Sequence, residues 1–269
     1  MKYEINCMPW RICAAAAVLM ALAAPRAGAD AIVKKDGSKV PGTSIAYKRV
    51  TQEYTLMADG VQMTFPRSQV DHVEVAKPPQ YDQAAKLVTD GKLDEAIPLL
   101  KAMIDDYDMR QWDNEGRDLL GFVYMKKKDC ANAVATYEAL IKNTDKSRVK
   151  PDTQRRYWDA MVGAGKYEAL TKELDDVIAT GSRESAATAF LVRGDVRHAQ
   201  KQTFDALMDY LHTAVLFEQV RETQPEALYK AAEVLDELKD PRAEEFRKRL
   251  QADYRDSKWA KMATEKSAP

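Results

Sequence analysis

Cysteine is scarce in this sequence of 269 residues, with three in total, two of them within the first 29 residues. Only Cys130 lies beyond that stretch, so the rest of the chain cannot form an internal disulfide. Its place between two helical patterns favours a small apolar side chain packed at a turn. An intermolecular disulfide or a reactive thiol is the alternative. Without disulfides the fold must be stabilised by apolar packing, and about 240 residues are enough to supply it.

Motifs typical of enzyme active sites are also lacking. No two of the three histidines (His72, His198 and His212) lie at metal-ligand spacing on one helix face, and neither H-E-x-x-H nor G-x-S-x-G occurs. Residues 163–166 contain Gly-Ala-Gly-Lys but lack the first glycine and the Ser or Thr of a phosphate-binding loop. We therefore expect no catalytic residues, no cofactor and no metal. An enzyme with an unrecognised site is the alternative.

Long apolar runs are absent except for residues 12–24, which follow a basic start containing Lys2 and Arg11. Ala27-Gly28-Ala29 then provides a small-x-small cleavage signal. This is the layout of a secretory signal peptide, so we expect residues 1–29 to be removed. A retained membrane anchor is the alternative, but crossing a bilayer takes about 20 apolar residues. The prediction is an exported protein that is periplasmic, outer-membrane-associated or secreted, with no integral membrane segment after cleavage.

The sequence also has no marked excess of charge of either sign, since it contains 41 Lys and Arg residues and 42 Asp and Glu residues. The charges are interspersed at helical spacing, which is typical of solvated helix faces. Neither nucleic acid nor an anionic membrane is therefore indicated as a partner.

Residues 30–76 are rich in short β-branched and aromatic runs, punctuated by Pro41-Gly42 and Asp59-Gly60. Asp59-Gly60 separates Tyr54–Met57 from Val61–Phe65, which is a strong hairpin signal. Four or five short strands in so short a segment predict a small, strongly bent barrel. The pattern resembles the SH3-like or Sm-like barrels at the start of some secreted repeat proteins.

The helical part of the chain repeats itself with a period of 37 residues. Residues 77–80, Lys-Pro-Pro-Gln, are expected to be a short linker, and helical patterns then run from 81 to 263 before a disordered tail at 264–269. A fixed period in this range predicts stacked helical hairpins, an α-solenoid of four to five units. The predicted turns fall at Gly91, Lys128, Gly165 and Gln202, and the recurring apolar positions are Leu93, Cys130, Tyr167 and Phe204, then Ala96, Ala133, Leu170 and Leu207, then Leu100, Tyr137, Leu174 and Leu211.

Each unit resembles the tetratricopeptide repeat, in which a small residue on the first helix (helix A) lets the second (helix B) approach closely. Leu120-Gly121 and Tyr137 carry this pattern in the second unit, whereas the fourth unit has Asp195 where a small residue is expected. A fifth unit is partial and shifted by about one residue. Its ending, Tyr254–Ala260, is similar to repeat endings in Tol–Pal accessory proteins and outer-membrane assembly lipoproteins, with Arg255 in place of proline.

The resemblance implies that helix A of each unit lines an inner groove. An apolar floor with a charged rim would hold an extended or helical peptide. The alternative is ordinary packing between units with surface charge. The groove positions are Tyr81, Asp118, Phe122, Met125, Arg155 and Asp159, together with Ala85, Val162, Val192 and Val196.

We therefore expect a mostly α-helical protein that acts as a non-catalytic scaffold or adaptor of the bacterial cell envelope and binds a partner protein through this groove. A structural subunit of a secretion, pilus or outer-membrane assembly is the alternative. The sequence does not name the partner.

Overall fold

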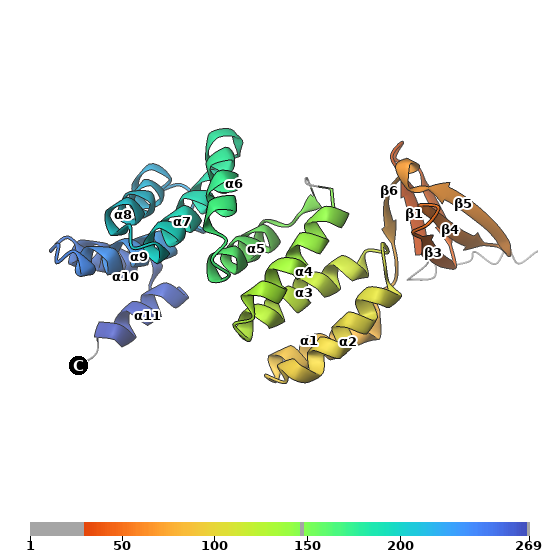
Figure 1. Ribbon diagram of the computed structural model, residues 1–269, viewed down its shortest axis with the longest axis horizontal. Helices are drawn as coiled ribbons and strands as arrows, with labels where there is room; N and C mark the ends of the chain where they lie inside the picture. The colour runs from red at the N-terminus through yellow and green to blue at the C-terminus, as the bar shows by residue number, and fades with distance from the viewer. Residues whose placement is uncertain (1–29, 146–147, 268–269) are drawn as a thin grey trace, which may run out of the picture.

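The computed structural model describes residues 30–145 and 148–267, which form an N-terminal sheet region and a longer row of helices (Figure 1). The expected signal peptide, residues 1–29, lies outside the described residues. The strands are β1 (Asp30–Lys34), β2 (Lys39–Gly42), β3 (Ser44–Lys48), β4 (Glu53–Ala58), β5 (Val61–Pro66) and β6 (Val70–Glu74), with a 3-10 turn η1 (Arg67–Gln69) before β6.

The strands form two three-stranded antiparallel sheets that do not close into one barrel, so the expected small, strongly bent barrel is not confirmed. The strand orders are β2-β1-β6 and β3-β4-β5, and the described edge strands of one sheet do not pair with those of the other. The chain bends at Gly42, where a Cβ atom would lie 2.4 Å from Leu56, and passes from one sheet to the other. The hairpin at Asp59-Gly60 is confirmed, because β4 pairs with β5 and both turn residues have positive φ, 50° and 79°.

The helices run from α1 to α11, and two boundaries differ from the prediction. The first helix begins at Pro79, inside the expected linker, because proline at the start of a helix loses no hydrogen bond. The last helix ends at Ser267, so residues 264–267 of the expected disordered tail are helical. The helices are α1 (Pro79–Thr89), α2 (Leu93–Asp106), α3 (Trp112–Lys126), α4 (Cys130–Asn143), α5 (Pro151–Gly163), α6 (Tyr167–Thr180), α7 (Arg183–Ala199), α8 (Thr203–Leu211) with the π-helical segment η3 (His212–Leu216), α9 (Gln224–Glu237), α10 (Ala243–Tyr254) and α11 (Lys258–Ser267).

The turns between paired helices confirm the period and locate a one-residue deletion in it. Gly91, Lys128 and Gly165 have φ of 75°, 60° and 70°, and they lie at the predicted positions. In the fourth unit the residue with positive φ is Lys201, at 62°, one position before the predicted Gln202. This unit is therefore one residue short.

The deletion explains why Phe204 does not pack as predicted. With the register counted from Lys201, the core positions fall on Ala206 and Tyr210, which are 0% and 2% exposed. Phe204 lies one position beyond its expected place and is 66% exposed.

A tyrosine of helix B lies directly on a glycine of helix A in two of the units. A Cβ atom on Gly121 of α3 would lie 2.5 Å from the ring of Tyr137 of α4, and one on Gly194 of α7 would lie 2.4 Å from the ring of Tyr210 of α8. No side chain fits at either position, so the two helices approach closely. Gly194, and not residue 195, is the small residue of the fourth unit.

The A helices (α1, α3, α5, α7 and α9) lie on the inner side of the stack. Successive A helices contact one another from α1 to α7, whereas the B helices (α2, α4, α6, α8 and α10) of successive units have less contact. The A side is therefore the concave face. The last helix, α11, packs against α9 and α10 and ends the row (Figure 1).

The sheet region is fixed to the helical row by the turn between α2 and α3. The Tyr54 hydroxyl donates to the Met109 carbonyl at 2.8 Å, and the Arg110 guanidinium donates to the Ile45 carbonyl at 2.9 Å. Among the described residues, no helix is long and apolar enough to cross a membrane.

Replacing Gly121 with alanine is expected to lower the free energy of unfolding by about 2 kcal/mol, because the new methyl group collides with the Tyr137 ring. Helix propensity alone predicts the opposite sign, a gain of about 1 kcal/mol. Urea unfolding measures the difference. In a double-mutant cycle, Gly121→Ala should cost much less when Tyr137 is replaced by leucine. A gain in stability in the wild-type background would contradict the close approach.

Candidate functional site

Six of the predicted groove residues, Tyr81, Asp118, Phe122, Met125, Arg155 and Asp159, lie on A helices and are partly exposed. Tyr81 of α1 packs edge-on against Trp112, with ring centroids 5.2 Å apart. Met125 of α3 packs against the main apolar core. The other four, Asp118 and Phe122 of α3 and Arg155 and Asp159 of α5, belong to two separate groups of charged side chains.

The first group surrounds Phe122. Asp118 pairs with Arg156 at 2.7 Å and accepts a hydrogen bond from the Thr153 hydroxyl at 3.0 Å. The Arg156 guanidinium lies 5.5 Å from the centroid of the Phe122 ring, and the Lys126 ammonium lies 5.1 Å from it. A half-buried ring flanked by two cations thus lies on the concave face between α3 and α5. The sequence placed Asp118 and Phe122 there but did not identify Arg156.

The second group is a cluster of five charged residues on α5, α7 and α9, which we call the charge cluster. Arg155 donates to Asp159 at 2.8 Å and to Glu226 at 2.7 Å, and Lys230 pairs with Asp195 at 2.7 Å. Arg155 also lies 3.7 Å from Asp195. Because Arg155 belongs to α5 and Glu226 to α9, the contact passes over the intervening unit and joins alternate A helices.

In the charge cluster the pKa values of Glu226 and Asp159 shift in opposite directions. Burial alone would raise the pKa of Glu226, but Arg155 and Lys230 lower it to about 2. Burial raises the pKa of Asp159 above its ordinary value, against the attraction of Arg155. Glu226 therefore stays ionised and stabilises the folded state, whereas ionised Asp159 opposes it.

Two of the expected groove positions are core residues. Val192 and Val196 of α7 are 0% and 1% exposed, so they do not form a groove floor. The one-residue deletion accounts for the error at Val196, since the position equivalent to Phe122 and Asp159 is Asp195. Ala85 and Val162 are half-buried.

The two units with a Tyr–Gly contact differ in what the tyrosine hydroxyl meets. The Tyr210 hydroxyl donates to Asp195 at 2.9 Å. The Tyr137 hydroxyl is buried without a hydrogen-bond partner among the described residues. Phe122 stands where the fourth unit has Asp195, one residue after the glycine, so no acceptor is present. A buried hydroxyl without a partner costs about 1–3 kcal/mol.

The other candidate residues, Cys130 and His198, make contacts that fit a structural role. Cys130 is half-buried, and its sulfur occupies the space where a Cβ atom on Gly163 would lie, at 2.4 Å. His198 pairs with Glu237 at 3.0 Å at a partly exposed edge. Within the described ranges, no group of three His, Cys, Asp or Glu residues is placed to hold a metal ion.

Comparison with known proteins supports the repeat fold. No family model and no curated protein matches the sequence. A crystal structure of nearly identical TPR-like repeats from a Podospora anserina putative kinesin light chain is 16% identical, covers 66% of this chain and 95% of its own, and has a TM-score of 0.51. MamA from Desulfovibrio magneticus is 14% identical over 68% of this chain and 99% of its own, with a TM-score of 0.47. YrrB, a TPR protein with an unusual peptide-binding site, is 14% identical over 70% of this chain and 91% of its own, with a TM-score of 0.41.

At these identities the likeness concerns the fold alone, and the fold is tetratricopeptide-like. Repeat proteins of this class generally act as protein-interaction scaffolds, because stacked units create an extended concave surface.

Replacing Glu226 with glutamine is expected to destabilise the protein by about 2 kcal/mol at neutral pH, because Arg155 and Lys230 lose their shared carboxylate. The folded-state pKa of about 2 lies below the unfolded value of about 4.3, so this stabilisation is present above pH 4.3 and is lost as the pH falls towards 2. Urea unfolding of both proteins between pH 7 and pH 2 should show the difference shrinking on acidification.

The matched control is Glu222→Gln, since Glu222 is exposed and has no ion pair among the described residues. This variant should unfold like the wild type at every pH. A difference for Glu226→Gln that stays constant down to pH 2 would contradict the assignment of the charge cluster.

Proposed function

We propose that the protein is a non-catalytic scaffold of the bacterial cell envelope and that it binds a segment of a partner protein on the concave face, at the part of that face formed by α3 and α5. The observation that carries the proposal is the ring of Phe122, which is half-buried and lies within 5.5 Å of the Arg156 guanidinium and 5.1 Å of the Lys126 ammonium. Aromatic residues, including phenylalanine, and arginine are enriched at protein interfaces.

The charge cluster argues for this part of the face over the rest. Between α5 and α9 the charged side chains of the concave surface already bind one another. A partner there would have to displace these ion pairs and leave buried charges unpaired, which costs several kcal/mol, on the order of 3. Around Phe122 there is a single ion pair, Asp118–Arg156, and Lys126 has no carboxylate within ion-pair distance among the described residues.

The envelope location is a proposal from the sequence. It is supported by the charge and apolar layout of residues 1–29 and by the similarity of the Tyr254–Ala260 ending to repeats of envelope proteins.

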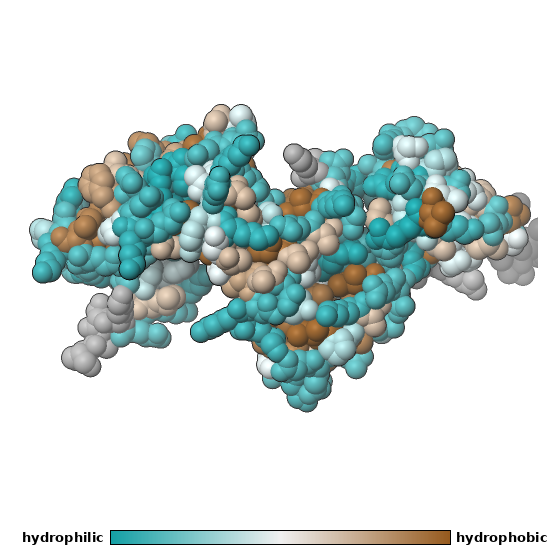
Figure 2. Space-filling model, in the orientation of Figure 1, coloured by the Kyte–Doolittle hydropathy of each residue, from teal (hydrophilic) through white to brown (hydrophobic). Residues whose placement is uncertain are grey.

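A structural subunit of an envelope assembly is the second candidate, and one observation favours it. Phe204, Val215 and Leu216, on α8 and η3, are 66%, 57% and 58% exposed. Figure 2 shows apolar side chains at the surface in the part of the row where α8 lies. Contiguous apolar patches at a surface mark sites of contact with another protein or a membrane.

The test is capture of partners from native envelopes by the tagged protein, comparing the wild type with Phe122→Ala combined with Arg156→Ala. The double variant should lose at least about 90% of the captured partner, because an aromatic–arginine anchor contributes more than 2 kcal/mol. Its thermal unfolding should change little, since both side chains are partly exposed.

Phe204→Ala, on the B side, is the matched control and should capture as well as the wild type. Loss of capture with Phe204→Ala and full capture with the double variant would overturn the scaffold proposal and support the structural subunit. Arg155 is unsuited to this test because its removal disrupts the charge cluster.

A further inference from the structure

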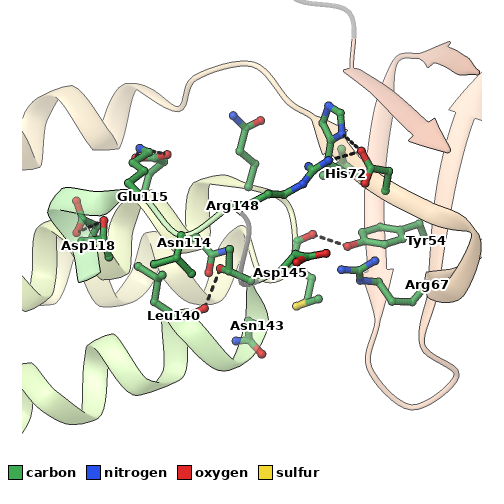
Figure 3. A pocket seen from close by; sticks show the side chains of 18 residues that line it. Tyr54, Arg67, His72, Asn114, Glu115, Asp118, Leu140, Asn143, Asp145 and Arg148 are labelled. Carbon is green, nitrogen blue, oxygen red and sulfur yellow. Dashed lines mark hydrogen bonds and ion pairs between the residues drawn. The ribbon is translucent and has the colours of Figure 1, made fainter. Parts of the chain in front are cut away.

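A cavity of about 420 Å³ lies between the sheet region and the helices α3 to α5 (Figure 3). Its size falls within the range of small-molecule sites, about 300–1,000 Å³, and such sites often form between two domains. Its lining comes from both sides: Tyr54 and Arg67 from the sheet region, and Asn114 and Asn143 from the helices. We call it the junction pocket.

The wall of the junction pocket on the sheet side is built rigidly. Burial raises the pKa of Tyr54 to about 12, so its hydroxyl stays protonated and donates to the Met109 carbonyl. Met109 and Gln111 have φ of 58° and 71°, although neither is glycine. Each such residue costs about 1–3 kcal/mol, and strain of this kind gathers at functional sites. Both residues line the pocket.

Arg67 is the charged group of the pocket that remains available. Asp71 pairs with Arg148, and Glu115 pairs with Lys150. Asp118 pairs with Arg156, and Asp145 also has an interaction partner. Arg67 donates one hydrogen bond, to the Val70 carbonyl at 2.8 Å, and has no carboxylate within ion-pair distance among the described residues.

An arginine with unused donors in a pocket is suited to a carboxylate, which the planar guanidinium can bind through two parallel hydrogen bonds. The pocket thus has one positive group available for an anion, and its acidic residues Asp71, Glu115 and Asp118 are already paired with cations.

Two further features of the junction pocket indicate which groups the rest of a ligand would carry. The side-chain amides of Gln111 and Asn143 have no hydrogen-bond partner among the described residues, so each can both donate to and accept from an amide. The buried side chains of Val73 and Leu140, which are 3% and 4% exposed, add an apolar wall.

We propose that the junction pocket binds a carboxylate of N-acyl amino-acid type: a carboxylate on Arg67, an amide on Gln111 or Asn143, and an apolar side chain against Leu140. A free small molecule and the end of a longer peptide share this chemistry. The proposal goes beyond the scaffold function, because the junction pocket shares only Asp118 and Thr153 with the group around Phe122 and its ligand does not need a partner on the concave face.

The test uses the purified full-length mature protein and measures binding by calorimetry and by amide chemical shifts near Met109 and Asn143. The probes are N-acetyl-leucine, N-acetyl-leucinamide and an octapeptide ending in leucine. N-acetyl-leucine should bind at least about tenfold more tightly than the amide, because only the acid can engage Arg67 through charge-assisted hydrogen bonds. Equal binding of acid and amide, or no binding of the acid, would overturn the proposal.

The octapeptide distinguishes the two sources of the ligand. Binding as tight as that of N-acetyl-leucine supports a site for peptide ends, and binding of the small acid alone supports a site for a free metabolite-sized ligand.

Three variants connect the binding to the pocket. Arg67→Gln should weaken the binding of N-acetyl-leucine by at least about tenfold. Arg221 is exposed and lies outside the pocket lining, so Arg221→Gln should leave this binding unchanged. Gln111→Gly should raise the melting temperature, because glycine adopts positive φ without strain, and yet weaken binding through loss of the amide. Unchanged binding in both Arg67→Gln and Gln111→Gly would contradict the assignment.

Discussion

The close contact between a tyrosine of helix B and a glycine of helix A is the interaction on which the helical row depends. At Gly121–Tyr137 and Gly194–Tyr210 the ring occupies the space of a missing side chain, so the two helices approach more closely than larger residues allow. Both tyrosines are almost fully buried and direct their hydroxyls towards groups of the concave face. The same contact therefore holds these two hairpins together and determines what their inner surfaces present.

The chemistry of the concave face depends on the residue after each glycine. Asp195 comes after Gly194, receives the Tyr210 hydroxyl and joins the charge cluster, in which Arg155 connects α5 with α9. Phe122 comes after Gly121, and there the Tyr137 hydroxyl has no partner among the described residues. One end of the concave face is thus filled by its own ion pairs, and the other presents an aromatic ring between two cations. This difference is the physical basis for placing a partner near α3 and α5.

The repeats, the turns and the Asp59-Gly60 hairpin were predictable because they depend on local patterns of glycine and apolar residues. The shortened fourth unit was not, although Asp195 stood out in the pattern, because a register shift by one residue changes which side chains face inward. The sequence did not predict the roles of Arg156, Glu226 and Lys230, because contacts between helices many residues apart leave no local pattern. The open sheets and the junction pocket likewise depend on how two regions pack.

The most direct test of this account is a distance measurement across the concave face. Spin labels at Asp152→Cys, on α5, and Glu222→Cys, just before α9, report the separation of alternate units by pulsed electron resonance, in a background in which Cys7, Cys13 and Cys130 are replaced by serine. We expect a single narrow distance distribution, which broadens and shifts to longer distances when Arg155→Gln removes the ion pair to Glu226. An identical narrow distribution in both proteins would show that the charge cluster does not close this part of the face.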